Sequence, residues 1–315
     1  MENKYLIVYT GPKESFSFVK DILSKKFDVV RVEPTEKSLL PQFSKCVAFL
    51  DASMKVRIST DAIQNAPNLK IIVTATTGAD HIDKKALNNR NIPLLTLKGE
   101  TELLNCFSGT AELSWLFLMG CARKFREALS HVQDGNWERT EFPGIMLENK
   151  TLGIIGVGRL GSHMVRYGHA FKMNVQAYDP LVRSFPKGVK KVVLEILLKT
   201  SDFITIHVHL SDDTRGLLDR NRIGIIKKGA SIINTSRGEI IDTDALVDAL
   251  KKGDISACGV DVLTGEPDIS KNPLWKYSKT HENVLITPHI GGFCPESVDR
   301  VVAFSADRIL KHFNK

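Results

Sequence analysis

Three residues with complementary chemistry follow strand-like apolar runs in the last third of the chain: Arg237, Glu266 and His289. Histidine titrates near neutrality and can act as a general acid or base. A neighbouring carboxylate raises the pKa of a histidine, because it stabilises the imidazolium. A guanidinium can grip a carboxylate through two parallel hydrogen bonds. This set can therefore bind an organic acid and transfer a proton at a neighbouring atom.

Each of these residues also has a purely structural interpretation. Arg237 with Gly238 can anchor a turn, Glu266 before Pro267 can begin a helix, and His289 can pack in a core. Their joint position favours the chemical interpretation, because ligands of open α/β sheets bind beyond the carboxyl ends of the strands. That interpretation requires the three segments to meet in the fold.

A glycine-rich loop lies between a strand-like run and a helical segment. Its sequence is Gly156-Val157-Gly158-Arg159-Leu160-Gly161. Gly156 permits a tight turn, Gly158 lets backbone approach a pyrophosphate, and Gly161 lets helix and strand pack closely. The helix N-terminus then offers free N–H groups and a positive dipole to phosphates. In this context the loop predicts a dinucleotide-binding site, and a structural glycine turn is the alternative.

An acidic residue, Asp179, follows the next strand-like run, 175–178. Its carboxylate can accept both ribose hydroxyls of an adenosine and repels a 2′-phosphate. The sequence therefore predicts NAD rather than NADP as the cofactor. Arg183, close behind, can weaken that preference.

Strand-like runs alternate with helical segments through most of the chain. In the N-terminal third the runs are 5–9, 29–32, 47–50, 71–75 and 93–97, with helical candidates at 15–24 and 82–89. Beyond residue 150 they are 152–156, 175–178, 203–208, 231–234, 257–260 and 284–287, with a helix expected at 162–171 after the glycine loop. Alternation of this kind indicates parallel sheets, because parallel strands need crossover connections. The predicted fold class is α/β, with two Rossmann- or flavodoxin-like parallel-sheet domains and a cleft between them.

The segment between these regions has a different pattern. Residues 110–125 predict a helix that is apolar nearly all round, with Ser108 as N-cap and Glu112 in its first turn. Such a helix is buried, either inside the protein or against a second subunit. A polar arm with exposed aromatics, Trp137 and Phe142, would favour a dimer, and internal packing is the alternative. A last helix is expected at 295–313.

Composition limits the classes of protein to consider. With 315 residues, 43% hydrophobic and 25% charged, the chain has the make-up of a soluble globular protein of about two domains. Its longest strongly apolar stretch, 113–122, is half of the about 20 residues that a membrane span needs. No secretory signal is visible at the N-terminus. We therefore expect no membrane partner.

Charge and cysteine usage point the same way. The net charge is +7, but basic residues come in pairs at most, which predicts a solvated surface and no nucleic-acid partner. A mild positive field also suits anionic small substrates. The 5 cysteines are scattered without a C-x-x-C motif, so we expect reduced thiols in a cytoplasmic protein and no metal site.

Five collinear stretches together resemble the D-isomer-specific 2-hydroxyacid dehydrogenases, a family that includes phosphoglycerate, D-lactate, glyoxylate/hydroxypyruvate and formate dehydrogenases. The stretches are T-G-A-D-H-I-D (77–83), T-L-G-I-I-G-V-G-R-L-G (151–161), N-T-S-R-G-E-I-I-D (234–242), G-V-D-V-L-T-G-E-P (259–267) and T-P-H-I-G-G (287–292). The last three are specific to that family. The chain departs from the family pattern at His209, where proline is frequent, and at Cys294, where threonine is frequent.

The resemblance implies an oxidoreductase that transfers a hydride between NAD(H) and C2 of a small D-2-hydroxy acid or 2-oxo acid. It assigns substrate binding to Arg237, tuning of the histidine to Glu266 and acid/base catalysis to His289. The pairing of Glu266 with His289 argues against formate as the substrate. The alternative is a non-catalytic NAD(H)-sensing regulator of the same fold.

The resemblance also implies the domain organisation and the ligand-binding residues. It predicts a discontinuous substrate-binding domain, 1–98 and 293–315, and an NAD-binding Rossmann domain, 99–292, whose helix and arm at about 108–150 form a homodimer. Asp261 is expected to contact the nicotinamide carboxamide. The residues expected at the cofactor are Gly156, Gly158, Arg159, Leu160, Gly161, Asp179, His207, Val208, Thr214, Thr235, Ser236, Arg237, Asp261, His289 and Gly291. Those expected at the substrate are Thr77, Gly78, Ala79, Lys98, Arg237 and His289.

Overall fold

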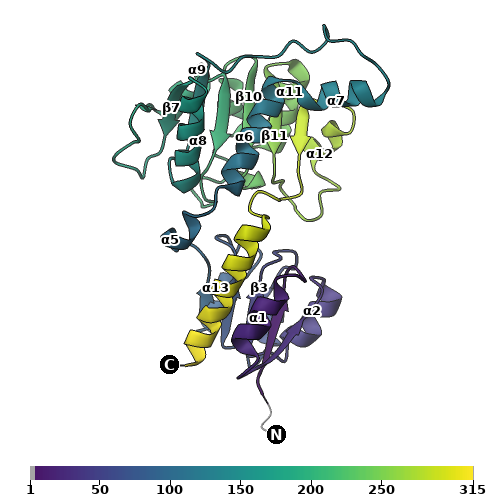
Figure 1. The fold of residues 1–315 in the computed structure, drawn as a ribbon, viewed down its shortest axis with the longest axis vertical. Helices are drawn as coiled ribbons and strands as arrows, with labels where there is room; N and C mark the ends of the chain where they lie inside the picture. The colour runs from purple at the N-terminus through teal and green to yellow at the C-terminus, as the bar shows by residue number, and fades with distance from the viewer. Residues whose placement is uncertain (1–3, 315) are drawn as a thin grey trace. The chain divides into compact units, whose positions relative to one another are not determined.

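The computed structural model describes residues 4–314, which divide into two compact units. The first unit comprises residues 4–107 and 294–314, and the second comprises Ser108–Phe293 (Figure 1). Residues 99–107, assigned to the second domain in the sequence analysis, pack with the first unit. The reason is apolar burial, because Leu103, Leu104 and Phe107 lie against the core of that unit.

The first unit is built on a five-stranded parallel sheet in the order β2-β1-β3-β4-β5. The strands are β1 (Leu6–Thr10), β2 (Asp28–Arg31), β3 (Ala48–Asp51), β4 (Ile71–Thr74) and β5 (Leu94–Leu95). The helices are α1 (Phe16–Leu23), α2 (Glu36–Phe43), α3 (Thr60–Gln64), α4 (Lys84–Asn89), α5 (Thr101–Leu104) and α13 (Pro295–Phe313). One apolar core joins the sheet to α1 and α13, and another joins it to α2, α3 and α4. The last helix thus returns to cover a sheet formed by the start of the chain.

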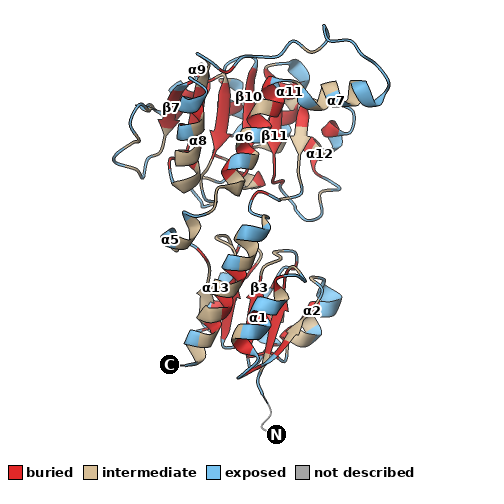
Figure 2. Ribbon diagram, in the orientation of Figure 1, coloured by how far each residue is buried: buried red, intermediate tan, exposed pale blue. Residues whose placement is uncertain are grey.

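The second unit holds a seven-stranded parallel sheet in the order β12-β11-β10-β9-β6-β7-β8. The strands are β6 (Thr151–Ile155), β7 (Asn174–Tyr178), β8 (Lys190–Lys191), β9 (Phe203–Ile206), β10 (Ala230–Asn234), β11 (Ile255–Val260) and β12 (Val284–Ile286). Figure 2 shows the central strands buried over most of their length. Strand order reverses at β6, so the loops after β6 and β9 flank the place where such sheets bind ligands.

Helices cover both faces of this second sheet. They are α6 (Gly109–Ala122), α7 (Phe125–Gln133), α8 (Arg159–Ala170), α9 (Leu194–Thr200), α10 (Arg220–Gly224), α11 (Thr243–Lys252) and α12 (Pro273–Ser278), with a short 3₁₀ turn at Gly238–Ile240. Buried side chains of α6 and α8 share one core with the sheet, and those of α9 to α12 share the other. The predicted fold class, two parallel-sheet α/β domains, is confirmed.

The predicted helix at 110–125 is wrong at its C-terminal end, whereas Ser108 is its N-cap residue as predicted. α6 stops at Ala122, Lys124 takes a left-handed backbone conformation (φ 47°), and α7 begins at Phe125. The break divides what looked like one apolar helix and places a second helix inside the predicted arm. The Ser108 side chain makes no capping bond to the helix backbone and instead donates to the Glu112 carboxylate.

Other differences from the predicted elements are smaller. The second sheet gains β8, a pair of lysines bonded to β7 that no apolar pattern could indicate. The first unit gains α2 and α3, which are short and contain few apolar residues. Among residues 4–314, no helix is both long enough and apolar enough to cross a membrane.

Candidate active site

Three adjacent strands of the second sheet end beside the three residues singled out first. Arg237 follows β10, Glu266 follows β11 and His289 follows β12, and these strands pair in parallel in the order β12-β11-β10. Neighbouring parallel strands present their carboxyl ends at the same edge of a sheet. The topology therefore delivers a guanidinium, a carboxylate and an imidazole to one edge.

The imidazole and the carboxylate are in direct contact. His289 Nδ1 lies 2.9 Å from Glu266 Oε1, and the two side chains are 33% and 32% exposed. A carboxylate on Nδ1 favours the proton on that nitrogen and fixes the ring orientation. Nε2 is then the ring nitrogen that can exchange a proton with a ligand. This is the pairing that the sequence analysis required of these two residues.

The loop that carries His289 is held by one buried carboxylate. Asp261 directly follows β11 and is 1% exposed. Its Oδ1 accepts the Ile290 N–H at 2.8 Å and the Thr287 hydroxyl, and its Oδ2 accepts the Gly291 N–H at 2.7 Å. Burial raises the pKa of Asp261, against the effect of these bonds. Asp261 was expected at a nicotinamide, and both of its oxygens bond the chain's own loop.

Strain at His289 explains why that brace is needed. The backbone of His289 has φ 58°, in the left-handed region that costs a non-glycine residue about 1 kcal/mol or more. The His289 N–H donates to the Asp261 carbonyl at 2.9 Å. The loop's geometry is therefore imposed by β11 and its flanking residue rather than by local preference.

Arg237 lies on a loop packed against the one that leads to Glu266. A Cβ placed on Gly238 would lie 2.2 Å from the Thr264 nitrogen and 2.3 Å from the Leu263 carbonyl carbon. Only glycine permits this approach of two backbones. The Arg237 carbonyl accepts the Asn234 side-chain amide at 2.8 Å, and its Nη1 donates to the Ser236 carbonyl at 2.7 Å. The backbones of the two loops thus meet at Gly238 and Thr264, two residues before Glu266.

The glycine loop between β6 and α8 has the shape that a pyrophosphate requires. Gly156 has φ +90°, and a Cβ there would lie 2.5 Å from the His207 carbonyl oxygen. A Cβ on Gly161 would lie 2.0 Å from the Gly156 carbonyl oxygen. At Gly158, by contrast, a Cβ would meet nothing within 4 Å, and no side chain caps the helix that begins at Arg159. The open space and the helix N-terminus fit a dinucleotide phosphate.

Asp179 bonds the same loop. Its Oδ2 accepts the Val157 N–H at 2.8 Å, and its Oδ1 accepts the Leu181 N–H at 2.9 Å. The carboxylate therefore lies beside the phosphate loop at the carboxyl end of β7, where the ribose of an adenosine is bound in Rossmann folds. These residues fit NAD.

Hydroxyl groups lie at the neighbouring strand ends, in the segments that follow β9 and β10. Ser236 donates to the Ile206 carbonyl at 2.8 Å, and the Thr235 hydroxyl lies 2.8 Å from that of Ser114 on α6. Both were expected at the cofactor, and both bond protein groups here. Thr214 likewise donates to the His209 carbonyl at 2.6 Å. Sequence reasoning missed Ser114, because it lies in the middle of an otherwise apolar helix.

His207 contributes to the loop through its backbone, while its ring is secluded. Nε2 lies 2.8 Å from the Thr205 hydroxyl, and Nδ1 is buried and meets no hydrogen-bond partner within residues 4–314. Burial lowers the pKa of His207 to about 3. The ring is therefore neutral at physiological pH. The next residue, Val208, packs close to Gly156, and a Cβ placed on Gly156 would lie 2.7 Å from its Cγ1.

The expected substrate residues of the first unit also gather at a carboxyl edge. Thr77, Gly78 and Ala79 follow β4, and Lys98 follows β5. The Leu97 N–H donates to the Thr76 carbonyl at 2.8 Å and joins the two loops.

Nowhere in the described part of the chain do three or more His, Cys, Asp or Glu side chains form a metal-binding group.

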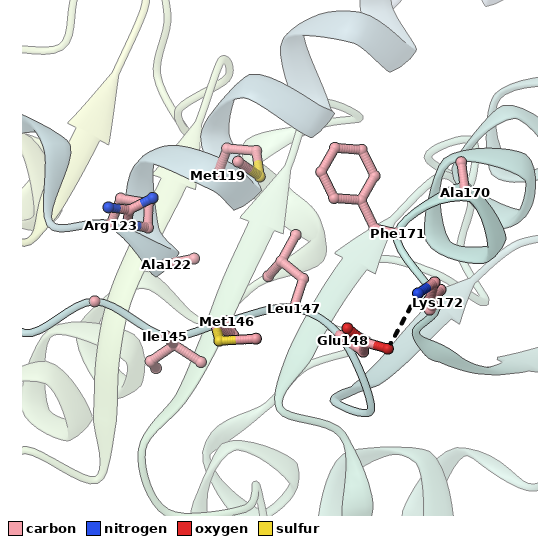
Figure 3. A pocket seen from close by; sticks show the side chains of 11 residues that line it. Met119, Ala122, Arg123, Ile145, Met146, Leu147, Glu148, Ala170, Phe171 and Lys172 are labelled. Atoms are coloured by element: carbon pink, nitrogen blue, oxygen red, sulfur yellow. Dashed lines mark hydrogen bonds and ion pairs between the residues drawn. The ribbon is translucent and has the colours of Figure 1, made fainter.

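A hollow of about 530 Å³ lies elsewhere on the second unit (Figure 3). The ends of α6 and α8 and the segment 144–148 line it, including Met119, Leu147 and Phe171, and a Glu148–Lys172 pair at 3.4 Å stands at one side. The glycine loop lies at the opposite end of α8. Arg237, Glu266 and His289 do not line this hollow, so we separate it from the active site.

Two family models match nearly the whole chain. Residues 115–291 match the D-isomer specific 2-hydroxyacid dehydrogenase NAD binding domain, and residues 7–102 match the catalytic domain of the same family. The first match falls on the unit that holds the glycine loop.

Individual proteins give the same result. The chain is 36% identical to D-3-phosphoglycerate dehydrogenase of Archaeoglobus fulgidus over 89% of its own length, but spans only 52% of that protein. It is 33% identical to hydroxypyruvate reductase of Thermotoga maritima, over 92% of both chains. The crystal structure of D-lactate dehydrogenase from Aquifex aeolicus, complexed with NAD and lactic acid, superposes with a TM-score of 0.83 at 28% identity, covering 98% of this chain and 95% of that one. The resemblance noted from the motifs is confirmed: the chain belongs to the D-isomer-specific 2-hydroxyacid dehydrogenase family.

Proposed function

We propose that the protein is an NAD-dependent oxidoreductase acting on the CH–OH group of a small D-2-hydroxy acid and on the corresponding 2-oxo acid. The observation that carries this is the His289–Glu266 pair at 2.9 Å, held at the edge of a sheet that also bears the glycine loop. NAD, when bound, supplies the hydride acceptor or donor for C2 of the substrate.

The chain's own residues then have distinct tasks. Arg237 binds the substrate carboxylate and polarises the reacting oxygen. His289 takes the hydroxyl proton through Nε2 in oxidation and returns it in reduction. Glu266 orients the ring through Nδ1 and stabilises the imidazolium, and Asp261 fixes the loop that presents it.

The substrate class follows from the site and from the relatives. A guanidinium suits a carboxylate, and the relatives include a hydroxypyruvate reductase and the glyoxylate reductase of Korarchaeum cryptofilum. We assign NAD binding, Arg237 and His289 to the second unit, and a further group of substrate-binding residues to the first. Thr77, Gly78 and Ala79 would hold the substrate's acidic group through backbone N–H groups, with Lys98 beside them.

The test is replacement of His289 by alanine. We expect the variant to lose about 10²–10⁴-fold in kcat for NADH-dependent reduction of 2-oxo acids, the usual worth of a positioned acid/base. Its Kd for NADH should stay near the wild-type value. His281, which precedes the amino end of β12 and stacks on Tyr277 at 3.8 Å, provides the matched control. A His289 variant with wild-type kcat would remove the residue from the mechanism.

A panel of 2-oxo acids tests the substrate class. The panel comprises glyoxylate, hydroxypyruvate, pyruvate, 3-phosphohydroxypyruvate and branched analogues. It covers the 2-oxo acids that correspond to the activities named for the relatives. We expect NADH consumption with at least one of them. Tight NADH binding without turnover of any would instead support an NAD(H)-sensing regulator.

We also propose that the protein is a homodimer assembled through α7 and the arm that follows it. Phe125, Leu129 and Val132 lie on one face of α7 and are 51%, 48% and 51% exposed, while Trp137 on the arm is 90% exposed. Monomeric proteins rarely leave such a set in water. A second copy is the occupant we assign to this surface, and Leu129→Asp with Trp137→Ser should shift the sedimentation from dimer to monomer. A wild-type monomer at micromolar concentration would contradict it.

We place the protein in the cytoplasm. All 5 cysteines are free thiols, and Cys46, Cys121 and Cys258 are buried. Unpaired cysteines are typical of a reducing compartment.

A further inference from the structure

A buried polar cluster that the proposed mechanism does not use lies at the carboxyl edge of the first unit's sheet. At its centre is Asp51, the last residue of β3, which is 2% exposed. The Thr10 hydroxyl donates to its Oδ1 at 2.7 Å, and His81 Nε2 lies 2.7 Å from its Oδ2. Thr10 ends β1 and is the register partner of Asp51. The cluster therefore joins two strand ends to a residue of the loop after β4.

Asp51 also shapes the loop that follows it. Its Oδ1 accepts the Ser53 N–H and hydroxyl, both at 2.8 Å, and the Met54 N–H at 3.3 Å. Met54 has φ 56°, a backbone conformation that an L residue adopts only where surrounding bonds enforce it. One carboxylate thus determines the path of residues 52–54.

The partners of Asp51 favour its ionised form. Burial acts to raise the pKa of Asp51, but the hydrogen bond and charge of His81, together with bonds from Thr10 and Ser53, hold that pKa below its ordinary value. The His81 side chain is only 11% exposed, and its Nδ1 has no hydrogen-bond partner among residues 4–314. Removing His81 would leave a buried carboxylate short of a donor, which is costly.

His81 is also tied to the loop that carries Thr77, Gly78 and Ala79. At the near end the Thr76 hydroxyl donates to the Gly78 carbonyl at 2.7 Å. At the far end the His81 carbonyl accepts the Ile58 N–H at 2.9 Å, and its ring reaches Asp51. The His81–Asp51 bond is therefore a buried side-chain anchor of the loop's far end.

We propose that Asp51 and His81 are positioning residues that hold the loop 76–81 in the geometry its backbone needs to bind the substrate's acidic group. The inference rests on the proposed function and deepens it, since neither residue is assigned a contact with the substrate. Losing an interaction that binds the substrate and the transition state equally raises KM and leaves kcat unchanged. Because the pair acts on the loop and not on the proton transfer, its loss should weaken substrate binding more than turnover.

The experiment compares His81→Leu, His81→Gln and Asp51→Asn with the wild type in NADH-dependent reduction of the preferred 2-oxo acid. We expect His81→Leu and Asp51→Asn to raise KM about 10–100-fold, with kcat within about 3-fold and the Kd for NADH unchanged. His81→Gln should recover most of the loss, because the glutamine amide nitrogen can take the place of Nε2 and donate to Asp51.

Arg90→Met is the control for simple loss of stability in the same unit. Arg90 ends α4 and donates to the carbonyls of Ile63, Ala66 and Pro67, near the amino ends of the strands. It should lower the melting temperature and leave KM at the wild-type value. Thermal melts of every variant identify any that fail to fold.

Each remaining outcome is decisive. A wild-type KM in folded His81→Leu overturns the inference while the proposed function stands. An equal rise of KM in Arg90→Met, or no recovery in a folded His81→Gln, also overturns it, because the effect would then be general or not carried by the bond to Asp51. A wild-type protein that reduces none of the 2-oxo acids overturns the proposed function and this inference together.

Discussion

The neutral ring of His207 makes the second unit sensitive to acid. Its Nδ1 is buried, its Nε2 meets Thr205, and burial lowers its pKa to about 3. An unfolded histidine has a pKa of about 6.5. Between these two values the unfolded chain binds a proton that the folded chain does not, so stability falls as the pH falls below about 6.5.

The size of the effect follows from the two pKa values. Integrating the difference in bound protons from pH 7.5 to pH 5.0 gives a loss of about 2 kcal/mol in the free energy of unfolding. Most of it, about four fifths, lies below pH 6.5, where the unfolded histidine is mostly charged. The loss continues towards pH 3 and levels off once the folded ring also takes up a proton.

The assay compares wild type with His207→Gln, whose amide can keep the contact with Thr205 but cannot titrate. All 3 tryptophans, Trp115, Trp137 and Trp275, lie in the second unit, so their fluorescence during urea unfolding reports on that unit. We expect the wild type to lose about 2 kcal/mol more than the variant between pH 7.5 and 5.0.

Thr205→Val is the matched control. It removes the hydroxyl 2.8 Å from Nε2 but leaves the ring buried, so it should lower stability at both pH values and keep the wild-type difference between them. Equal acid losses in wild type and His207→Gln would refute the reasoning, because the ring could not then be held neutral by its burial.

Two substitutions test other parts of the second unit. Gly238→Ala places a Cβ 2.2 Å from the Thr264 nitrogen, so the loop that leads to Glu266 must shift. We expect kcat to fall at least about 10-fold while the affinity for NADH is unchanged. A variant with the wild-type kcat would show that this contact does not align the site. Asp179→Ala removes the carboxylate beside the glycine loop and should lower the ratio of kcat/KM with NADH to kcat/KM with NADPH. A wild-type protein that already prefers NADPH would contradict the assignment of Asp179 to the ribose.

The parts of the fold that were predictable are those in which local pattern and burial agree. The helix expected at 295–313 is α13, with Pro295 at its start, because its apolar residues recur at helical spacing and meet one core. The strands of both sheets lie within a few residues of the apolar runs, since parallel strands buried on both faces leave an uninterrupted apolar signal. The edge strand β8 has no such signal, because Lys190 and Lys191 are exposed and only backbone bonds define it.

The site was predictable as a set of residues but not as a geometry. Motif spacing placed Glu266 and His289 after neighbouring strands, and the structure places their side chains 2.9 Å apart. The role of Asp261 could not be read in the same way, because two of its three side-chain partners are backbone N–H groups, which any residue type can supply. The break at Lys124 was hidden for a related reason: residues on both sides of it are good helix formers.

The strained loop at His289 connects these points. A histidine with φ 58° is less stable than one in a relaxed helix or strand, and the loop adopts this conformation because three bonds to the Asp261 carboxylate and one to its carbonyl outweigh the cost. The same bonds set the direction in which the ring leaves the backbone, and so they set where Glu266 can meet Nδ1. In the second unit, Asp261 therefore orients the proton-transferring ring through the backbone that carries it, just as Asp51 in the first unit orients a binding loop. In both units a carboxylate at the carboxyl end of a strand shapes the neighbouring loop through bonds to its backbone N–H groups, a role that neither composition nor motif spacing can show.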